Sequence, residues 1–369
     1  MKHKTQRPKK KIVAVVTCAL TASVATPLLM HEANAADPRI CINGTLKAEA
    51  REAEVGNAQR RSTVRGASWK LFSDKEELAG GFTADNGSFN ACHTSSIRKN
   101  NLRVVFASST AYSQILQLGA QRQYTFDSGS LGSSSQNLGD VLVRDTQENQ
   151  LVGRAFKMLD TLNDLYARRS SGTACWTIRQ QPYGCGQLKV VWPSTEGAWF
   201  VPTTGLVHLK EPDGTSKHTA LHEAGHFFMN ALLGGTPPSD CKGKDGSGGH
   251  QFGEANGLTC AWNEGFADAV AAYVLGDRNY VWGNGTVHEL DKDRDRWDVG
   301  DKVQDRVGVS LLDMWAADGG WTRTLDVMSK AGAPFVSFQD FLRAKRSAFP
   351  GSASSDRAIA QRNGLTYPL

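Results

Sequence analysis

Beyond its first 35 residues, this sequence has no net charge and no second long apolar run. Those residues hold six of the 42 lysines and arginines and one of the 37 acidic residues, which leaves 36 of each. The pI of about 8.8 therefore comes mostly from the N-terminal segment. Because no basic patch remains, nucleic-acid binding is not expected. No later segment is apolar enough over about 20 residues to span a membrane.

The long apolar run lies at the N-terminus, from Ile12 to Met30. Six lysines and arginines precede it, and Ala33-Asn34-Ala35 follows as a small-residue cleavage site. This order is typical of a secretory signal peptide over residues 1–35. We therefore expect cleavage near Ala35 and a secreted mature chain. An uncleaved anchor is the alternative, and the cleavage site argues against it.

Cysteine is scarce, and no two cysteines have the C-x-x-C spacing that would support a thiolate zinc site. Of the seven, Cys18 lies in the signal segment, and the other six form an even set. In an exported chain an even set favours disulfides. Proximity along the sequence suggests the pairs Cys41–Cys92, Cys175–Cys185 and Cys241–Cys260.

Two short motifs carry the candidate chemistry. His222-Glu223-Ala224-Gly225-His226 is an H-E-x-x-H sequence in an apolar pattern that predicts a helix ending at Gly234-Gly235. On a helix its two imidazoles lie one turn apart on one face. A catalytic zinc usually needs a third protein ligand and an open position for water. Asn263-Glu264-Gly265-Phe266-Ala267-Asp268 opens a second predicted helix that runs to about Leu275, and Glu264 is placed to be that ligand.

A solvated helix face beside an unrelated acidic helix is the alternative interpretation. Glu264 and Asp268 are four residues apart, so one helix face carries both carboxylates. Histidines with carboxylate support are what a zinc centre requires. The two motifs together therefore favour a metal site.

On these residues the chain resembles the gluzincin metallopeptidases, the superfamily that includes thermolysin. Their signature is H-E-x-x-H followed by a glutamate ligand on a second helix. The resemblance implies that His222, His226 and Glu264 bind one zinc ion. It also implies that Glu223 is the general base and that Asp268 holds a ligand imidazole.

Two other zinc classes were weighed on the same residues. Metzincins require H-E-x-x-H-x-x-G-x-x-H, and Met229 and Leu232 stand where that Gly and His would fall. This class is therefore excluded. A site with Asp268 as the third ligand stays an alternative to Glu264. The loop between the two motifs is longer than in thermolysin-like enzymes, so it must have a different path.

The expected reaction is hydrolysis of a peptide bond. Zinc makes a bound water more acidic and polarises a carbonyl group, and Glu223 would move the proton of that water to the leaving amine. Oxyanion donors must point at the charge that develops on the carbonyl oxygen. His288, in a glycine-rich loop, is the candidate, with Tyr280, Tyr273 and His250 behind it. His218 lies four residues before His222 on the same helical face. We expect it to be a first-turn surface residue, with support of the metal site as the alternative.

Short β-type runs fill residues 36–145 and predict a small antiparallel β-sandwich. The runs lie at 40–46, 68–72, 80–89, 102–106 and 123–126. Residues 83–89 resemble the hairpin of prealbumin-like or carboxypeptidase-regulatory-like domains. The expected role of this accessory domain is folding or spacing, with substrate binding or a removable pro-domain as alternatives.

Residues 146–369 are expected to form the metallopeptidase domain, so the fold class is α+β with a mixed sheet and a helical C-terminal lobe. A core helix is predicted at about 148–168, and strands at 188–192 and 205–209. By resemblance, the second strand is the sheet edge that pairs with an extended substrate. Helices are predicted at 301–317, 322–331 and 338–347.

The acidic run from Asp291 to Asp301 has the spacing of a calcium loop but not its pattern. An EF-hand needs Gly at the sixth position and Glu at the twelfth, where this chain has Arg296 and Lys302. We interpret the run as a solvated loop, with calcium as the alternative to it.

The function expected from sequence is a secreted, monomeric zinc endopeptidase that acts on proteins or peptides, with no membrane partner in the mature form. An exopeptidase on the same scaffold is one alternative, although no G-x-M-E-N-like signature is present. A non-catalytic zinc-bearing protein is another. Glu223 argues against it, because zinc retention alone requires no base. No sequence pattern indicates which substrate side chains the enzyme would prefer at the cleavage site.

Overall fold

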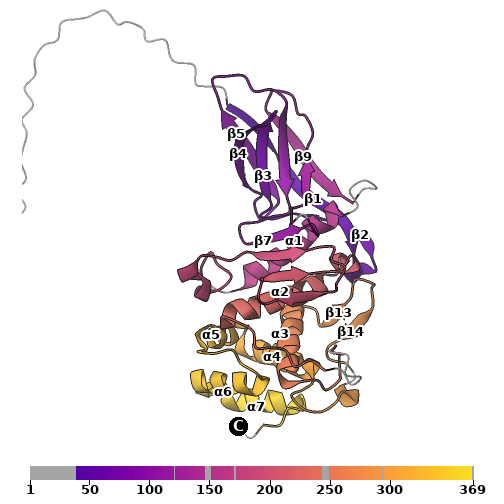
Figure 1. Ribbon diagram of the computed structural model, residues 1–369, viewed down its shortest axis with the longest axis vertical. Helices are drawn as coiled ribbons and strands as arrows, with labels where there is room; N and C mark the ends of the chain where they lie inside the picture. The colour runs from indigo at the N-terminus through magenta and orange to yellow at the C-terminus, as the bar shows by residue number, and fades with distance from the viewer. Residues whose placement is uncertain are drawn as a thin grey trace, which may run out of the picture. The chain divides into compact units, whose positions relative to one another are not determined.

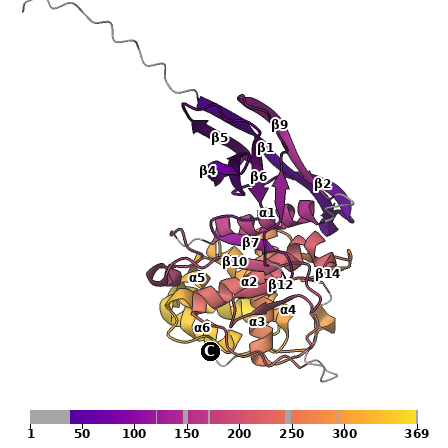
Figure 2. The same cartoon turned by 45° about the horizontal axis from the view of Figure 1, so that its top comes forward.

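The described part of the chain begins with a long strand that organises a four-stranded sheet, which can be followed in Figures 1 and 2. The computed structural model describes residues 39–119, 121–145, 151–169, 172–242, 249–292 and 294–367. The expected signal peptide and its cleavage site lie outside them. The described residues belong to one compact unit.

In the first sheet, the central strand β1 (Arg39–Glu52) pairs antiparallel with β2 (Ala58–Thr63) and β5 (Ser88–Thr94). It also pairs with β9 (Gln136–Arg144), but in parallel. The expectation of a purely antiparallel sandwich was therefore wrong at this strand. Parallel neighbours need a crossover connection, and here β9 follows a strand of the second sheet and enters the first sheet in the direction of β1.

The second sheet is antiparallel throughout, in the order β4-β3-β6-β8. Its strands are β3 (Ser68–Ser73), β4 (Glu76–Phe82), β6 (Leu102–Ala107) and β8 (Thr125–Asp127). Buried and half-buried side chains alternate along β6, as expected for a strand with one face in a core. Phe89 and Phe106 meet edge to face at 4.9 Å between the two sheets.

A third sheet has the order β11-β12-β10-β7. It comprises β7 (Ser113–Leu116), β10 (Leu188–Val191), β11 (Trp199–Val201) and β12 (Leu206–His208). Strand β7 precedes the domain boundary expected at residues 145–146, yet it pairs in parallel with β10 beyond it. The two halves of the chain therefore share a sheet.

The third sheet also corrects the expected substrate-binding edge. The strand predicted at residues 205–209 is β12, and it lies between β10 and β11. It is an internal strand, because Trp199–Val201 pairs with its outer side. The exposed edge on this side of the sheet belongs to β11. A three-residue strand preceded by Gly197 and Ala198 is too short to be predicted from periodicity.

Seven α-helices lie within the described residues. They are α1 (Val152–Arg168), α2 (Lys217–Leu233), α3 (Leu258–Leu275), α4 (Gln304–Asp318), α5 (Thr322–Lys330), α6 (Phe338–Ala348) and α7 (Ala353–Arg362). A small hairpin, β13 (Asn279–Val281) and β14 (Val287–Glu289), follows α3. Short 3₁₀ segments lie at Ala53–Val55, Ile178–Tyr183, Pro212–Thr215, Arg294–Arg296 and Pro350–Ser352. Helix α7 was not expected from the sequence.

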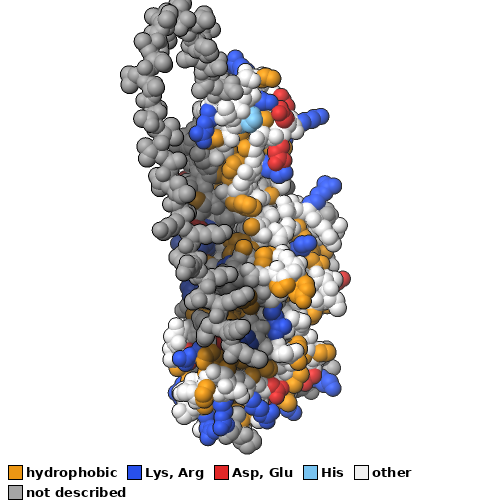
Figure 3. Space-filling view, turned by 90° about the vertical axis from the view of Figure 1, so that its left-hand side faces the viewer, with side chains coloured by type: hydrophobic (Ala, Val, Ile, Leu, Met, Phe, Trp, Pro, Cys, Tyr) orange, Lys and Arg blue, Asp and Glu red, His pale blue; other side chains and the backbone are white. Residues whose placement is uncertain are grey.

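Residues 39–145 hold β1 to β9 and are called here the β-rich half of the chain. Figures 1 and 2 place α1 between this half and the remaining helices. Its predicted apolar stripe is buried, including Ala155, Leu159, Leu162 and Leu165, each with no exposed surface. No helix in the described part of the chain is long and apolar enough to cross a bilayer. On the face shown in Figure 3, basic, acidic and hydrophobic side chains are interspersed.

Three disulfides are present: Cys41–Cys92, Cys175–Cys185 and Cys241–Cys260. These are the pairs that proximity along the sequence suggests. The first joins directly opposed residues of β1 and β5. The third ties the loop after α2 to the first turn of α3.

A buried ion pair joins the end of β1 to α1. Glu52 pairs with Lys157, and both side chains are almost fully shielded from water. Burial acts to raise the pKa of Glu52, but the hydrogen bond and charge of Lys157, with Lys217, hold that pKa below its ordinary value of 4.5. The same burial lowers the pKa of Lys157. As the pH falls, Glu52 becomes protonated and loses its negative charge, whereas Lys157 keeps its positive charge.

We expect Glu52→Gln to reduce the free energy of unfolding by about 3 kcal/mol at neutral pH, because Lys157 is then buried without its partner. The stabilisation by Glu52 is complete above its unfolded pKa and is lost as pH falls through the lower folded pKa. The difference between variant and wild type should therefore shrink below about pH 4. Urea unfolding at pH 7 and pH 3 measures it, and a difference independent of pH would contradict the assignment.

Candidate metal centre

The histidines of the first motif lie in a helix whose two ends are both specified locally. Ser216 precedes α2, and its hydroxyl accepts a hydrogen bond from the N–H of Thr219. Gly234 ends the helix in the left-handed conformation, with φ of 72°. Helix α2 contacts α1, α3 and the strands β11 and β12. This explains why His222 and Glu223 are buried although they are polar.

Two glycines allow α3 to pack closely against its neighbours. A Cβ on Gly225 would lie 3.0 Å from the Cα of Ala267 in α3. A Cβ on Gly265 would lie 2.6 Å from the carbonyl oxygen of Gln304, at the start of α4. Neither position has room for a side chain. The close approach brings Glu264 and Asp268 of α3 to the histidines of α2.

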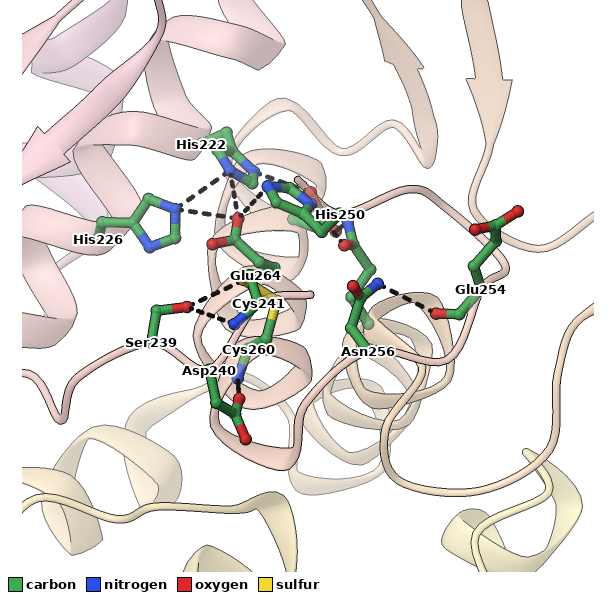
Figure 4. The surroundings of a disulfide bond; sticks show 12 residues. His222, His226, Ser239, Asp240, Cys241, His250, Glu254, Asn256, Cys260 and Glu264 are labelled. Atoms are coloured by element: carbon green, nitrogen blue, oxygen red, sulfur yellow. Dashed lines mark hydrogen bonds and ion pairs between the residues drawn. A yellow bond between two sulfur atoms is a disulfide. The ribbon is translucent and has the colours of Figure 1, made fainter. Parts of the chain in front are cut away.

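Three potential ligand atoms converge between the two helices, as Figure 4 shows. Oε2 of Glu264 lies 3.1 Å from Nε2 of His222 and 3.3 Å from Nε2 of His226. The two Nε2 atoms are 3.2 Å apart. Tetrahedral zinc with bonds of about 2.0–2.1 Å holds its ligand atoms about 3.4 Å apart, so these separations fit the ion. Within the described residues, this is the group of three that qualifies as a metal site.

Asp268 contacts His222 from α3, one helical turn after Glu264. Its Oδ1 lies 2.8 Å from Nδ1 of His222, and its Oδ2 accepts a hydrogen bond from the side chain of Gln304 at 3.0 Å. The residue is completely buried, unlike an ordinary solvated helix carboxylate. A carboxylate at Nδ1 leaves the Nε2 lone pair of the imidazole available to a metal.

The electrostatics of the group favour a positive charge at its centre. Burial acts to lower the pKa of His222, but electrostatic interactions with Tyr280 and Asp268 and the hydrogen bonds of Asp268 and Glu264 raise it well above its ordinary value. Burial acts to raise the pKa of Glu264, whereas the nearby histidines hold it well below its ordinary value. Two imidazoles and two carboxylates thus stabilise a cation, which is the charge that Zn²⁺ brings.

Glu223 lines the same cavity as the group of three but is not part of that group. It is buried, and among the described residues its Oε2 has no hydrogen-bond partner. Burial raises the pKa of Glu223, with His222 and His226 acting in the opposite direction. A buried carboxylate oxygen without a partner, beside a potential metal site, is placed to interact with water or substrate.

A cavity of about 960 Å³ opens onto these residues. Its lining comes from the edge strand β11, the loop after α2, the hairpin β13–β14 and the start of α4. Aromatic side chains form much of one wall, including Phe252, Tyr280 and Trp282, whose rings lie 5.2 to 5.4 Å apart. A long, partly apolar cavity that ends at a charged centre is typical of an enzyme site.

His288 lines this cavity. Its Nε2 lies 2.6 Å from Oδ1 of the buried Asp305, and its ring stacks on Phe252 at 4.1 Å. Asp305 also accepts a hydrogen bond from the N–H of Gly253 at 2.6 Å. The ring of His288 is therefore held in one orientation at the cavity wall. The sequence did not indicate Asp305.

The other oxyanion candidates lie in different surroundings. Tyr280 is buried in the cavity lining, and its ring lies 5.8 Å from that of His222. His250 lines the cavity with its Nε2 3.4 Å from Oε2 of Glu264 and its Nδ1 2.7 Å from the side chain of Gln304. Tyr273 packs against Trp315 and Trp321 in the helical core, away from the cavity lining.

His218 corrects another expectation. It was expected to be a first-turn surface residue, but it is only 1% exposed. Its Nδ1 lies 3.4 Å from a carboxylate oxygen of Glu54. Glu54, which covers His218, belongs to the β-rich half and lies more than 160 positions earlier in the chain. Periodicity within the helix could therefore not show that His218 is buried.

The loop between the two motifs is anchored at the metal centre. Cys241 bonds to Cys260, which lies one helical turn before Glu264, and Oδ1 of Asp240 accepts a hydrogen bond from the N–H of Cys260 at 2.8 Å (Figure 4). Residues 243–248 lie outside the described residues. The anchored ends bring the loop residues 236–239 and 250–252 to the cavity rim.

The acidic run near residue 291 makes ion pairs with basic side chains. Asp291 pairs with Arg278 at 2.7 Å and with Arg294 at 2.6 Å. Asp298 accepts a hydrogen bond from the N–H of Ala255 at 2.9 Å. Asp293 lies outside the described residues. Because Asp291 is paired with Arg278 and Arg294, the run fits a solvated loop better than a calcium site.

Two family models match the chain. The one described as the mycolysin C-terminal domain matches residues 169–363, and the one described as the mycolysin middle domain matches residues 41–150. No curated protein matches. One similar solved structure is the crystal structure of the major plantain pollen allergen Pla l 1, with 13% identity and a TM-score of 0.19, over 29% of this chain and 94% of that one.

Proposed function

Since this chain belongs to the mycolysin family and is therefore a metallopeptidase, we propose that it is a secreted zinc endopeptidase with Glu223 as its general base. One observation carries the proposal. Three potential ligand atoms from His222, His226 and Glu264 lie within 4.8 Å of one another, and Glu223, a buried carboxylate with one partnerless oxygen among the described residues, lines the same cavity.

The proposed mechanism assigns each side chain one task. His222, His226 and Glu264 would hold the zinc ion, and Asp268 would orient the ring of His222 through Nδ1. When bound, zinc supplies a Lewis acid that makes water more acidic and polarises the substrate carbonyl. Glu223 accepts the proton of the attacking water on its carboxylate and delivers it to the leaving amine. Its buried position favours holding that proton between the two steps.

The substrate would bind as an extended peptide along β11. This strand lies at the edge of its sheet, and Trp199 and Phe200 line the cavity. An extended peptide can add to such an edge through backbone hydrogen bonds, while its side chains enter the cavity. We further propose that His288, held at Nε2 by Asp305, donates a hydrogen bond from a protonated Nδ1 to the carbonyl oxygen as negative charge develops on it.

Reversible removal of the metal tests the proposal. The purified mature chain should cleave a mixed peptide library, lose that activity in a strong chelator, and recover it when one equivalent of Zn²⁺ is returned. Products with new termini inside the peptides identify an endopeptidase, and single residues removed from an end identify an exopeptidase. Cleavage that persists after the zinc content has fallen below a tenth of an equivalent would refute the zinc mechanism.

A further inference from the structure

A residue from the β-rich half of the chain caps the active-site helix α2. Glu54 lies in the short 3₁₀ segment Ala53–Val55, directly after β1. Its Oε1 accepts hydrogen bonds from the backbone N–H groups of Lys217 at 2.6 Å and His218 at 3.2 Å. The same oxygen lies 3.4 Å from Nδ1 of the His218 ring. The side chain of Glu54 is only 15% exposed, so water competes weakly for these contacts.

These contacts complete the N-terminus of the helix. The first N–H groups of a helix have no partner within it. Ser216 satisfies the N–H of Thr219 through its hydroxyl and that of Ala220 through its carbonyl. Glu54 accepts from the two N–H groups that Ser216 leaves. Its carboxylate also lies at the positive end of the helix dipole, where negative charge is favourable.

The capped turn lies directly before the residues of the metal centre. His218 is four positions, or about one turn, before His222. The ring of Tyr280 connects them, at 5.6 Å from the ring of His218 and 5.8 Å from that of His222. Because an α-helix moves nearly as a rigid body, the position of its first turn sets the positions of His222, Glu223 and His226.

A second carboxylate, Glu52 at the end of β1, holds this turn through the side chain of Lys217. Oε2 of Glu52 lies 3.1 Å from Nζ of Lys217, and Glu52 also pairs with Lys157 of α1. The end of β1 is therefore bound to both α1 and α2. Its two acidic side chains are mostly shielded from water, so their positions are defined more sharply than those of surface ion pairs.

We infer that Glu54 is a positioning residue for the metal centre, and that the β-rich half of the chain is a working part of the catalytic unit. The β-rich half is then neither a passive spacer nor a segment that can be removed without loss of activity. The inference rests on the proposed function, because it assigns Glu54 the placement of ligands and base for that reaction. Shifts of about 1 Å in such groups can reduce turnover strongly.

The test compares Glu54→Ala and the milder Glu54→Gln with Glu49→Ala in the full mature chain. Glu49 is a matched control, because it lies on β1 and pairs with Arg61 and Arg144 at the surface. Three readouts are needed: kcat and KM for a peptide, the zinc dissociation constant from competition with a chelator, and the visible spectrum of the cobalt-substituted protein. We expect Glu54→Ala to lower kcat and weaken zinc binding about tenfold each, and to shift the cobalt spectrum, with KM changed less than about twofold.

Each outcome decides the inference. Glu54→Gln keeps hydrogen-bond acceptors but loses the charge, so it should fold and give intermediate effects if Glu54→Ala does not fold. A lower melting temperature with wild-type kcat, zinc affinity and cobalt spectrum in Glu54→Gln would overturn the positioning role. Equal effects of Glu49→Ala would overturn it as well. An inactive wild-type chain would refute the proposed function instead, while zinc affinity and the cobalt spectrum still report on Glu54.

Discussion

Glu223→Gln is expected to lower peptide cleavage by about 10²–10⁴-fold while zinc stays bound. Glutamine has the shape of glutamate, and Glu223 makes no hydrogen bond through Oε2 among the described residues that the substitution would break. The three ligand atoms belong to other side chains. The variant therefore removes the proton acceptor and leaves the metal centre intact.

Cleavage of one defined peptide, with zinc content measured on the same samples, checks this prediction. The loss should appear in kcat, because the base acts on the reaction after the substrate has bound. Glu77→Gln is the matched control, since Glu77 is exposed on β4 and pairs with Lys70 at the surface. Full activity of Glu223→Gln, or a loss explained by missing zinc, would exclude Glu223 as the general base.

His222→Ala is expected to abolish tight zinc binding and activity together. The substitution removes one of three ligand atoms, and it also leaves the buried carboxylate of Asp268 without the ring that it contacts at 2.8 Å. Asp268→Asn keeps all three ligand atoms and alters only the support of His222. It should weaken zinc binding by about 10–100-fold, the range typical of groups that orient a ligand.

Competition with a chelator measures the zinc affinity of both variants and of the wild type. The expected order of affinity is wild type, then Asp268→Asn, then His222→Ala. His93→Ala, in β5 of the β-rich half, controls for the loss of a histidine elsewhere. Undiminished zinc affinity in His222→Ala would remove this residue from the ligand set. Equal affinities of Asp268→Asn and wild type would show that Asp268 does not support the metal.

Local features of the fold could be predicted because they depend on residues close together in the chain. The apolar pattern around His222 and the glycine after it predicted a helix that ends where α2 ends, at Leu233. The second motif predicted a helix reaching Leu275, where α3 ends. Four-residue spacing placed Glu264 and Asp268 on one face, and both lie next to His222.

Contacts between distant segments could not be predicted in the same way. The sheet edge was assigned to residues 205–209, but strand pairing depends on partners anywhere in the chain, and β11 covers that strand. The direction of β9 and the position of β7 were missed for the same reason. The roles of Gln304 and Asp305 followed only from the approach of α4 to α3, which the glycine contacts permit.

The sequence by itself identified the candidate residues of the site: two imidazoles, one carboxylate proposed as the third ligand and another proposed as the base, at spacings that two helices impose. It also determined the cysteine pairs that proximity favours. Only the tertiary structure decided how this centre is held. The cap of α2 by Glu54 joins residues more than 160 positions apart, and hydrogen bonds over such separations depend on the packing of whole domains, which no local pattern encodes.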